Sequence, residues 1–394
     1  MEPEQHPIRL VVADDLRRSR LTVLFRLLLS LPHLVWLWLW TLVVLLAAVV
    51  AWIAALFAGR LPDPFHRFLS AYVRYGTHVA AYLSLAANPF PGFVGRPGSF
   101  PVDLEVAEPE RQNRWSIFFR PILGIPALLL AAAFSGGNGG GGGGGAIGTS
   151  AFLGWFASLV RGRMPGGLRG LLAYSIRYVA QTYGYLLLLT SRYPDAHPAA
   201  PVLERPLDHP IRLEAREDLR RSRLTVLFRL LLYLPHLVWL LLWGIAAFLA
   251  AIANWFAALV RGRPAPPLHR FLAAYVRYLT HTSAFVYLVA NPFPGFTGRP
   301  GTYPVELLIA EPERQNRWVT GFRLLLALPA ILLLSALNAA FGISAALAWF
   351  HSLVLGRTRP GLLGLGAYSL RYAGQVYAYL LLLTVRYPHS APPA

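Results

Sequence analysis

The stretch His33–Phe57 reads HLVWLWLWTLVVLLAAVVAWIAALF and decides the fold class, because none of its 25 residues is an acid or an arginine. As a helix it would be ~38 Å long, enough to cross a hydrocarbon layer of ~30 Å. A near copy, LPHLVWLLLWGIAAFLAAIANWFAALV, occupies Leu234–Val260. A soluble helix of this length would show a polar stripe, and these segments have none. The pattern therefore predicts an all-α integral membrane protein.

The composition agrees with a membrane protein. Of 394 residues, 56% are hydrophobic and only 14% are charged, and the mean hydropathy is +0.48. An ordinary soluble domain has about 25% charged residues, and disordered chains have low hydrophobicity. Cysteine is absent, which excludes disulfides and thiolate metal sites. All 36 basic residues are arginine, so a Schiff-base lysine and a P-loop lysine are excluded as well.

Internal repetition organises the chain. RLTVLFRLLLSLPHLVWLWLW at Arg20 returns as RLTVLFRLLLYLPHLVWLLLW at Arg223, and each half divides again into two related parts. Every part has a tryptophan before a Gly-Arg turn, an Arg-Tyr step beyond it and an aromatic-Pro step at its end. We expect four units of two spans each, which gives eight transmembrane helices. The predicted units are residues 1–93, 94–200 (with a glycine-rich insertion at 136–145), 201–296 and 297–394.

Each unit is expected to contain the same series of elements. In the first, an amphipathic helix over residues 15–31 lies at the interface, and a kink at Pro32 leads into the spanning helix. A tight Gly-Arg turn follows, and a second helix returns over about residues 66–88. An even number of spans would place all extended segments and both termini on one side of the membrane. Basic residues are more numerous on that side, so we expect it to be cytoplasmic.

Short segments with alternating hydrophobicity open the units and predict strands. At one position the four segments carry charges of alternating sign, namely Arg9, Asp103, Arg212 and Glu306. Opposite charges across a strand pair are favourable. We therefore expect a small strand-rich cap at the membrane surface, in which basic strands lie beside acidic ones. Four separate extended linkers are the alternative.

Two sets of arginines are candidates for lipid or anion binding. The interfacial lipid anchors precede the first and fifth predicted spans: Arg17, Arg18, Arg20, Arg26, Arg220, Arg221, Arg223 and Arg229. The second set is a repeated quartet in the returning helices with two neighbouring histidines: Arg74, Arg177, Arg277 and Arg371 with His78 and His281. Four intramembrane arginines would line an anion path or hold lipid phosphates. The alternative is that both sets anchor helix ends or reach to the headgroups.

The glycine run 136–145, interrupted by Asn138, cannot keep a helix, because each glycine costs ~1 kcal/mol relative to alanine. It is no phosphate loop, since no lysine follows it. It is either a hinge in a broken helix or a tolerated insertion. We expect no enzyme, because carboxylate pairs stand only where they would cap helices and the histidines lack metal-ligand spacing. No metal or other cofactor is predicted.

The repeated tryptophan, Gly-Arg turn, Arg-Tyr helix and aromatic-Pro end resemble a bacterial family of small two-pass membrane proteins that is classed as a domain of unknown function. The turn is closest at Gly59-Arg60, Gly262-Arg263-Pro264 and Gly356-Arg357 and looser at Gly162-Arg163-Met164-Pro165. The resemblance implies four fused copies and no particular activity.

From these observations we expect a non-catalytic protein of the bacterial cytoplasmic membrane, structural or accessory, with its termini and strands in the cytoplasm. Its expected partners are anionic phospholipids, and a membrane-protein complex or a homo-oligomer. Nucleic acid is not expected, because the arginines alternate with lipid-seeking helices. The alternative function is an anion channel, a transporter or a lipid-moving pathway lined by the repeated arginines.

Overall fold

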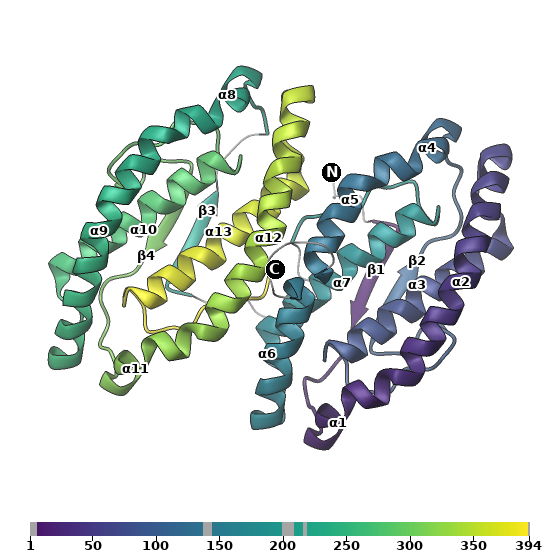
Figure 1. The fold of residues 1–394 in the computed structure, drawn as a ribbon, viewed down its shortest axis with the longest axis horizontal. Helices are drawn as coiled ribbons and strands as arrows, with labels where there is room; N and C mark the ends of the chain where they lie inside the picture. Colours follow the sequence, from purple (N-terminus) through teal and green to yellow (C-terminus); the bar gives the residue numbers. More distant parts are fainter. Residues whose placement is uncertain (1–5, 137–143, 199–208, 216–218, 393–394) are drawn as a thin grey trace. The chain divides into compact units, whose positions relative to one another are not determined.

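The computed structural model describes residues 6–136, 144–198, 209–215 and 219–392. The chain forms two compact units, Met1–Arg205 with Ala391–Ala394, and Pro206–Ser390. Each unit takes in two of the repeats seen in the sequence (Figure 1).

Both units have the same series of elements, except that the first has two helices, α5 and α6, where the second has the single helix α12. The first contains β1 (Ile8–Val12), α1 (Arg20–Leu24), α2 (Arg26–Ala58), α3 (Asp63–Leu83), β2 (Val102–Val106), α4 (Arg114–Phe118), α5 (Arg120–Ser135), α6 (Gly145–Arg161) and α7 (Gly166–Leu186). The second contains β3 (Ile211–Ala215), α8 (Arg223–Leu227), α9 (Arg229–Arg261), α10 (Pro266–Val286), β4 (Val305–Ile309), α11 (Arg317–Gly321), α12 (Arg323–Leu355) and α13 (Pro360–Leu380).

The first long helix begins earlier than the sequence predicts. The break between α1 and α2 lies at Phe25, whose φ of −93° and ψ of 7° interrupt the helix, and α2 then continues through Pro32. The break turns the next residue, Arg26, into the interior of the unit, where its guanidinium is bound. The helix ends at Gly59, which has a φ of 69° and therefore suits glycine.

The glycine run interrupts a helix, as predicted. Helix α5 ends at Ser135 and α6 begins at Gly145, and their lengths together equal the 33 residues of α12 in the second unit. Gly136 and Gly145 lie so close that a Cβ on Gly145 would come within 2.4 Å of the Gly136 nitrogen. Residues 137–143, on which the choice between a hinge and a tolerated insertion depends, lie outside the described residues.

The predicted strands are present, and they form two antiparallel pairs within the described residues, β1 with β2 and β3 with β4. Arg9 and Asp103, the opposite charges at the equivalent position of their segments, do not pair with each other. In the β1–β2 register Arg9 lies opposite Glu105, while Asp103 lies opposite Val11. Because the strands run antiparallel about the central pair Leu10 and Leu104, each of the other positions of one strand lies opposite a position that is not its equivalent in the other repeat.

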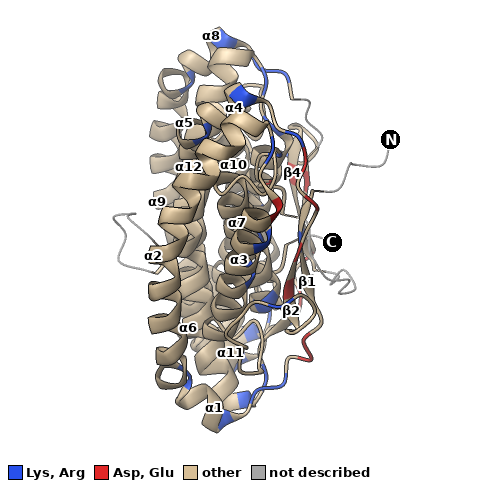
Figure 2. Cartoon of the chain, turned by 90° about the vertical axis from the view of Figure 1, so that its right-hand side faces the viewer, with Lys and Arg blue, Asp and Glu red and all other residues tan. Residues whose placement is uncertain are grey.

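The strand pair lies along the side of the helices and not across their ends. Strand β2 follows α3, since Asp103 contacts His78 and the Leu104 carbonyl accepts from Arg74. Strand β1 lies along α7, where the Gln181 side chain donates to the Ile8 carbonyl. In each unit the short returning helices therefore form a middle layer between the strands and the long helices (Figure 2).

The two repeats of a unit run in opposite directions. The Arg18 N–H donates to the Gly162 carbonyl, so the segment before α1 adjoins the Gly-Arg turn of the second repeat. Reciprocally, the Gln112 N–H donates to the Gly59 carbonyl in the turn of the first repeat. The expectation that all extended segments lie on one side, away from the Gly-Arg turns, is therefore wrong, because each end of the unit has a Gly-Arg turn beside the extended segment that leads into α1 or α4.

The core lies between the middle layer and its two neighbours. Leu69, Val73 and Leu172 of the middle layer are buried together with Leu104 of β2. By contrast, the long helices expose apolar side chains along their outer face, including Leu28, Trp38, Leu46 and Phe57 in α2. Within the described residues, α2, α9 and α12 are long and apolar enough to cross a membrane. This supports membrane association.

Candidate functional site

The predicted quartet arginine of the first repeat binds the neighbouring strand and loop. Arg74 of α3 donates from Nε to the Leu104 carbonyl at 2.9 Å and from Nη1 to the Gly95 carbonyl at 3.2 Å. Its Nε also lies 3.7 Å from the carboxylate of Asp103, which pairs with His78 at 2.8 Å. The acid that balances the charge of Arg74 is Asp103. Because Asp103 lies in a strand, the sequence of the predicted spans does not reveal it.

The third repeat has the same arrangement with a glutamate. Arg277 of α10 lies 2.9 Å from Glu306 of β4 and donates to the Gly298 carbonyl at 3.1 Å. His281 lies 3.5 Å from the same carboxylate. Burial raises the pKa of Glu306, although the positive charge of Arg277 opposes this. Arg74, His78, Arg277 and His281 thus join the middle layer to the strands.

The other two quartet members have different surroundings. Arg177 donates to the His197 carbonyl at 2.5 Å, and its guanidinium lies 5.4 Å from the centre of the Tyr174 ring. Arg371 lies over the Tyr368 ring at the same distance. Within the first unit, Arg74 and Arg177 therefore make separate contacts.

The predicted lipid anchors divide into buried and exposed residues. Arg26 is 2% exposed, donates to the Ala87 carbonyl at 2.9 Å and lies 4.3 Å from the Tyr82 ring centre. Arg18 is also buried and donates to the Leu85 carbonyl at 2.8 Å. Both arginines satisfy carbonyls at the end of α3, so their side chains do not face a headgroup. Arg221 and Arg229 have the same role beside α10.

The exposed arginines form rims at both ends of the long helices. We call one the α1 rim and the other the α4 rim. The α1 rim contains Arg17, Arg20, Arg161 and Arg163, and the α4 rim contains Arg60, Arg111 and Arg114. The backbones of Arg17 and Arg163 form a bridge, as do those of Arg60 and Arg111.

The second unit has equivalent exposed arginines. The predicted anchors Arg220 and Arg223 lie at its α8 end, where the backbone of Arg220 bridges that of Arg357. Arg261, Arg263, Arg314 and Arg317 are exposed at the other end. The arginines of the Gly-Arg turns and of the segments before α4 and α11 were missing from the predicted anchors. Their place beside one another, as for Arg163 and Arg17, depends on the opposite directions of the two repeats, which the sequence does not reveal.

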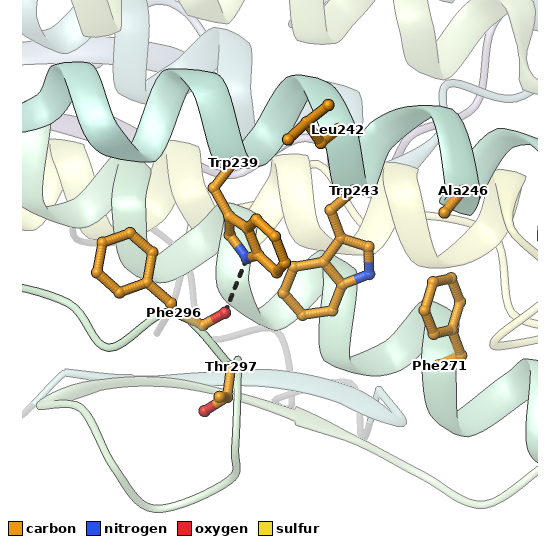
Figure 3. A pocket seen from close by; sticks show the side chains of 7 residues that line it. All are labelled: Trp239, Leu242, Trp243, Ala246, Phe271, Phe296 and Thr297. Carbon is orange, nitrogen blue, oxygen red and sulfur yellow. Dashed lines mark hydrogen bonds between the residues drawn. The ribbon is translucent and has the colours of Figure 1, made fainter.

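An aromatic pocket of about 430 Å³ lies against α9 (Figure 3). Trp239 and Trp243 line it with Phe271 and Phe296. The indole N–H of Trp239 donates to the Phe296 carbonyl at 2.9 Å, so the polar edge of this ring is satisfied. Trp36 makes the same bond to Phe93 in the first unit. Such amphipathic rings are enriched where apolar and aqueous layers meet.

A different, apolar groove of about 350 Å³ lies between helices of the first unit. Its lining includes Leu37 and Thr41 of α2, Gly76 of α3, Ile147 of α6 and Ala180 of α7. The described residues contain no group of three or more histidines or acids arranged to hold a metal ion. The candidate site in the described residues therefore consists of apolar surface, aromatic rings and arginine side chains.

The model of a family described as a domain of unknown function (DUF4389) matches residues 20–94, 223–297 and 317–391. The chain belongs to this family. The matches confirm the repeated-domain resemblance seen in the sequence, and the repeat that carries the glycine run lies outside them. No curated protein and no solved structure matches this DUF4389 chain.

Proposed function

We propose that this DUF4389 protein is a non-catalytic membrane protein, structural or accessory, that binds anionic phospholipids through its exposed arginine rims. The observation that carries the proposal is an uncharged apolar layer with arginines at both ends. No acid or arginine occurs between Arg26 and Arg60 or between Arg120 and Arg161. Arginine near a membrane surface favours anionic headgroups by about 1 kcal/mol per residue.

The proposed location is the bacterial cytoplasmic membrane, with the strands and termini facing the cytoplasm. The sequence predicts eight spans for this location, and the alternative is that the helices lie along one leaflet. The anion-pathway alternative depends on the quartet arginines. Arg74 and Arg277 already bind carbonyls and carboxylates, so nothing in their placement favours that function.

The test compares lipid binding by two matched double variants of the full chain in mild detergent. Native mass spectrometry counts bound phosphatidylglycerol and phosphatidylcholine. Arg17→Gln with Arg163→Gln removes two charges from the α1 rim. Arg9→Gln with Arg96→Gln removes two exposed charges on the strand side of the same unit.

We expect phosphatidylglycerol to bind in preference to phosphatidylcholine. The rim variant should bind phosphatidylglycerol about thirtyfold more weakly, and the strand-side variant should bind it as the parent does. Equal binding of the two lipids by the parent, or equal losses in the two variants, would show that the rims are not the lipid site.

A further inference from the structure

The position of the strands bears directly on how a unit meets the membrane. Strand β2 runs along α3, with Asp103 near His78 and Leu104 at Arg74. If α3 crossed the bilayer, β2 would cross it as well. An open two-stranded sheet leaves polar backbone groups without partners, and such edges do not occur in hydrocarbon.

The outer side of the strand pair is charged. Arg9 and Glu105 form an ion pair at 2.7 Å, and each side chain is 55% exposed. In a spanning arrangement this pair would face lipid at the depth of the middle of α3. An exposed pair of charges at that depth is costly, whereas in water it costs nothing. The strand side therefore needs water.

The directions of the two repeats lead to the same conclusion. The chain leaves α3 near the α1 rim and enters α4 at the opposite end, where Gln112 bonds to Gly59. In a spanning unit, this extended return segment would have to pass through the hydrocarbon layer. If the helices lie parallel to the membrane surface, both repeats present their long helices to the same leaflet and their strands to water.

Dimensions also fit the parallel arrangement. Helix α2 has 33 residues and is therefore about 50 Å long. A spanning α2 would extend beyond the ~30 Å of hydrocarbon at its ends, although its uncharged part, residues 33–57, is long enough to cross that layer. The outer helices are one helix thick, about 10 Å, whereas a single leaflet offers about half of the ~30 Å core.

We propose that each unit lies flat in one leaflet, with the outer face of α2, α5 and α6, or of α9 and α12, in the acyl chains and the strand pair in water. The occupant of the apolar face is lipid, because exposed arginines border it at both ends and exposed tryptophans such as Trp38 lie within it. This seating deepens the proposed function and rests on it for the identity of the partner.

The experiment uses single cysteines, since the natural chain has none. Ser19→Cys and Arg60→Cys mark the two ends of the outer helices, Val11→Cys marks the strand side and Leu46→Cys the apolar face. Each full-length variant is treated with a membrane-impermeant maleimide in right-side-out and in inverted vesicles. Ser222→Cys and Arg263→Cys repeat the end markers in the second unit, and thermal melting identifies any variant that is not folded.

For flat seating we expect the Ser19, Arg60 and Val11 markers to react from the same side, and the Leu46 marker to react only after denaturation. Reaction of the two end markers from opposite sides would overturn the proposal in favour of spanning helices. Reaction of the Leu46 marker in intact vesicles would overturn it as well. This experiment distinguishes flat seating from headgroup preference. If the markers react from the same side but phosphatidylglycerol and phosphatidylcholine bind equally well, only the lipid selectivity is rejected.

Discussion

At the residue scale, the arginine that follows each Phe break acts as a helix cap. Arg26, Arg120, Arg229 and Arg323 are all nearly fully buried and lie over an aromatic ring. Their guanidinium groups satisfy carbonyls at the ends of the returning helices, which would otherwise lack donors. The sequence shows the repeated Phe-Arg step but not its acceptors, because these lie about 60 residues away.

We therefore predict that Arg26→Gln destabilises the first unit by about 3 kcal/mol, since a buried charged donor is lost and two carbonyls lose their partner. For a unit of this size the melting temperature should fall by roughly 6–12 °C. The matched control is Arg20→Gln, which removes an exposed arginine six residues earlier. Thermal melting in detergent measures both, and equal losses would refute the capping role.

Glu306 predicts a pH effect with a defined sign. Burial raises its pKa in the folded protein above the ordinary value of 4.5. Its contribution to stability is then fully present below the unfolded pKa and is lost as the pH rises through the folded pKa. The stability of the parent relative to Glu306→Gln should therefore improve as the pH falls from 7 to 4.5. Melting curves of both proteins across this range test the prediction, and a constant difference would contradict it.

At the element scale, the alternating hydrophobicity of the sequence was sufficient to predict the strands but not to predict their register. Arg9 pairs with Glu105, and both side chains are half exposed. We predict that Arg9→Glu alone costs no more than about 1 kcal/mol, and that Arg9→Glu combined with Glu105→Arg restores stability. Combining Arg9→Glu with Asp103→Arg should not restore it, because Asp103 binds His78. Melting temperatures of the three variants decide between these partners.

The glycine run allows a prediction about a whole helix. Deleting residues 136–144 should join α5 and α6 into one helix of the length of α12, because the two ends already adjoin. We expect an unchanged or higher melting temperature and retained helical circular dichroism, since the joined helix would have the same length as α12. As a control, deleting nine residues from the middle of α12, which is continuous, should abolish folding of the second unit. A large loss from the first deletion would show that the run has a structural role.

At the scale of the molecule, the repeat visible in the sequence is only half of the unit that forms a hydrophobic core, because each unit contains two repeats. Identical motifs made each repeat look complete. Yet β1 finds its partner in the next repeat, and Gly162 of the second repeat binds Arg18 of the first. The sequence could predict four copies, apolar helices and strands, because these depend on local patterns. It could not predict the opposite directions of neighbouring copies or the position of the strands, because those depend on contacts between distant residues.

The pairing of repeats leads to a prediction for truncated chains. Residues 1–205 contain both members of the β1–β2 pair and their own core, so this fragment should fold and remain with membranes after washing at high pH. Residues 1–93 end before β2, and their Arg18 would lack the Gly162 carbonyl beside it. We expect this shorter fragment to be degraded, or to melt without a cooperative transition. Membrane fractionation and melting of both fragments test the idea, and a cooperatively folded 1–93 fragment would show that a single repeat is the folding unit.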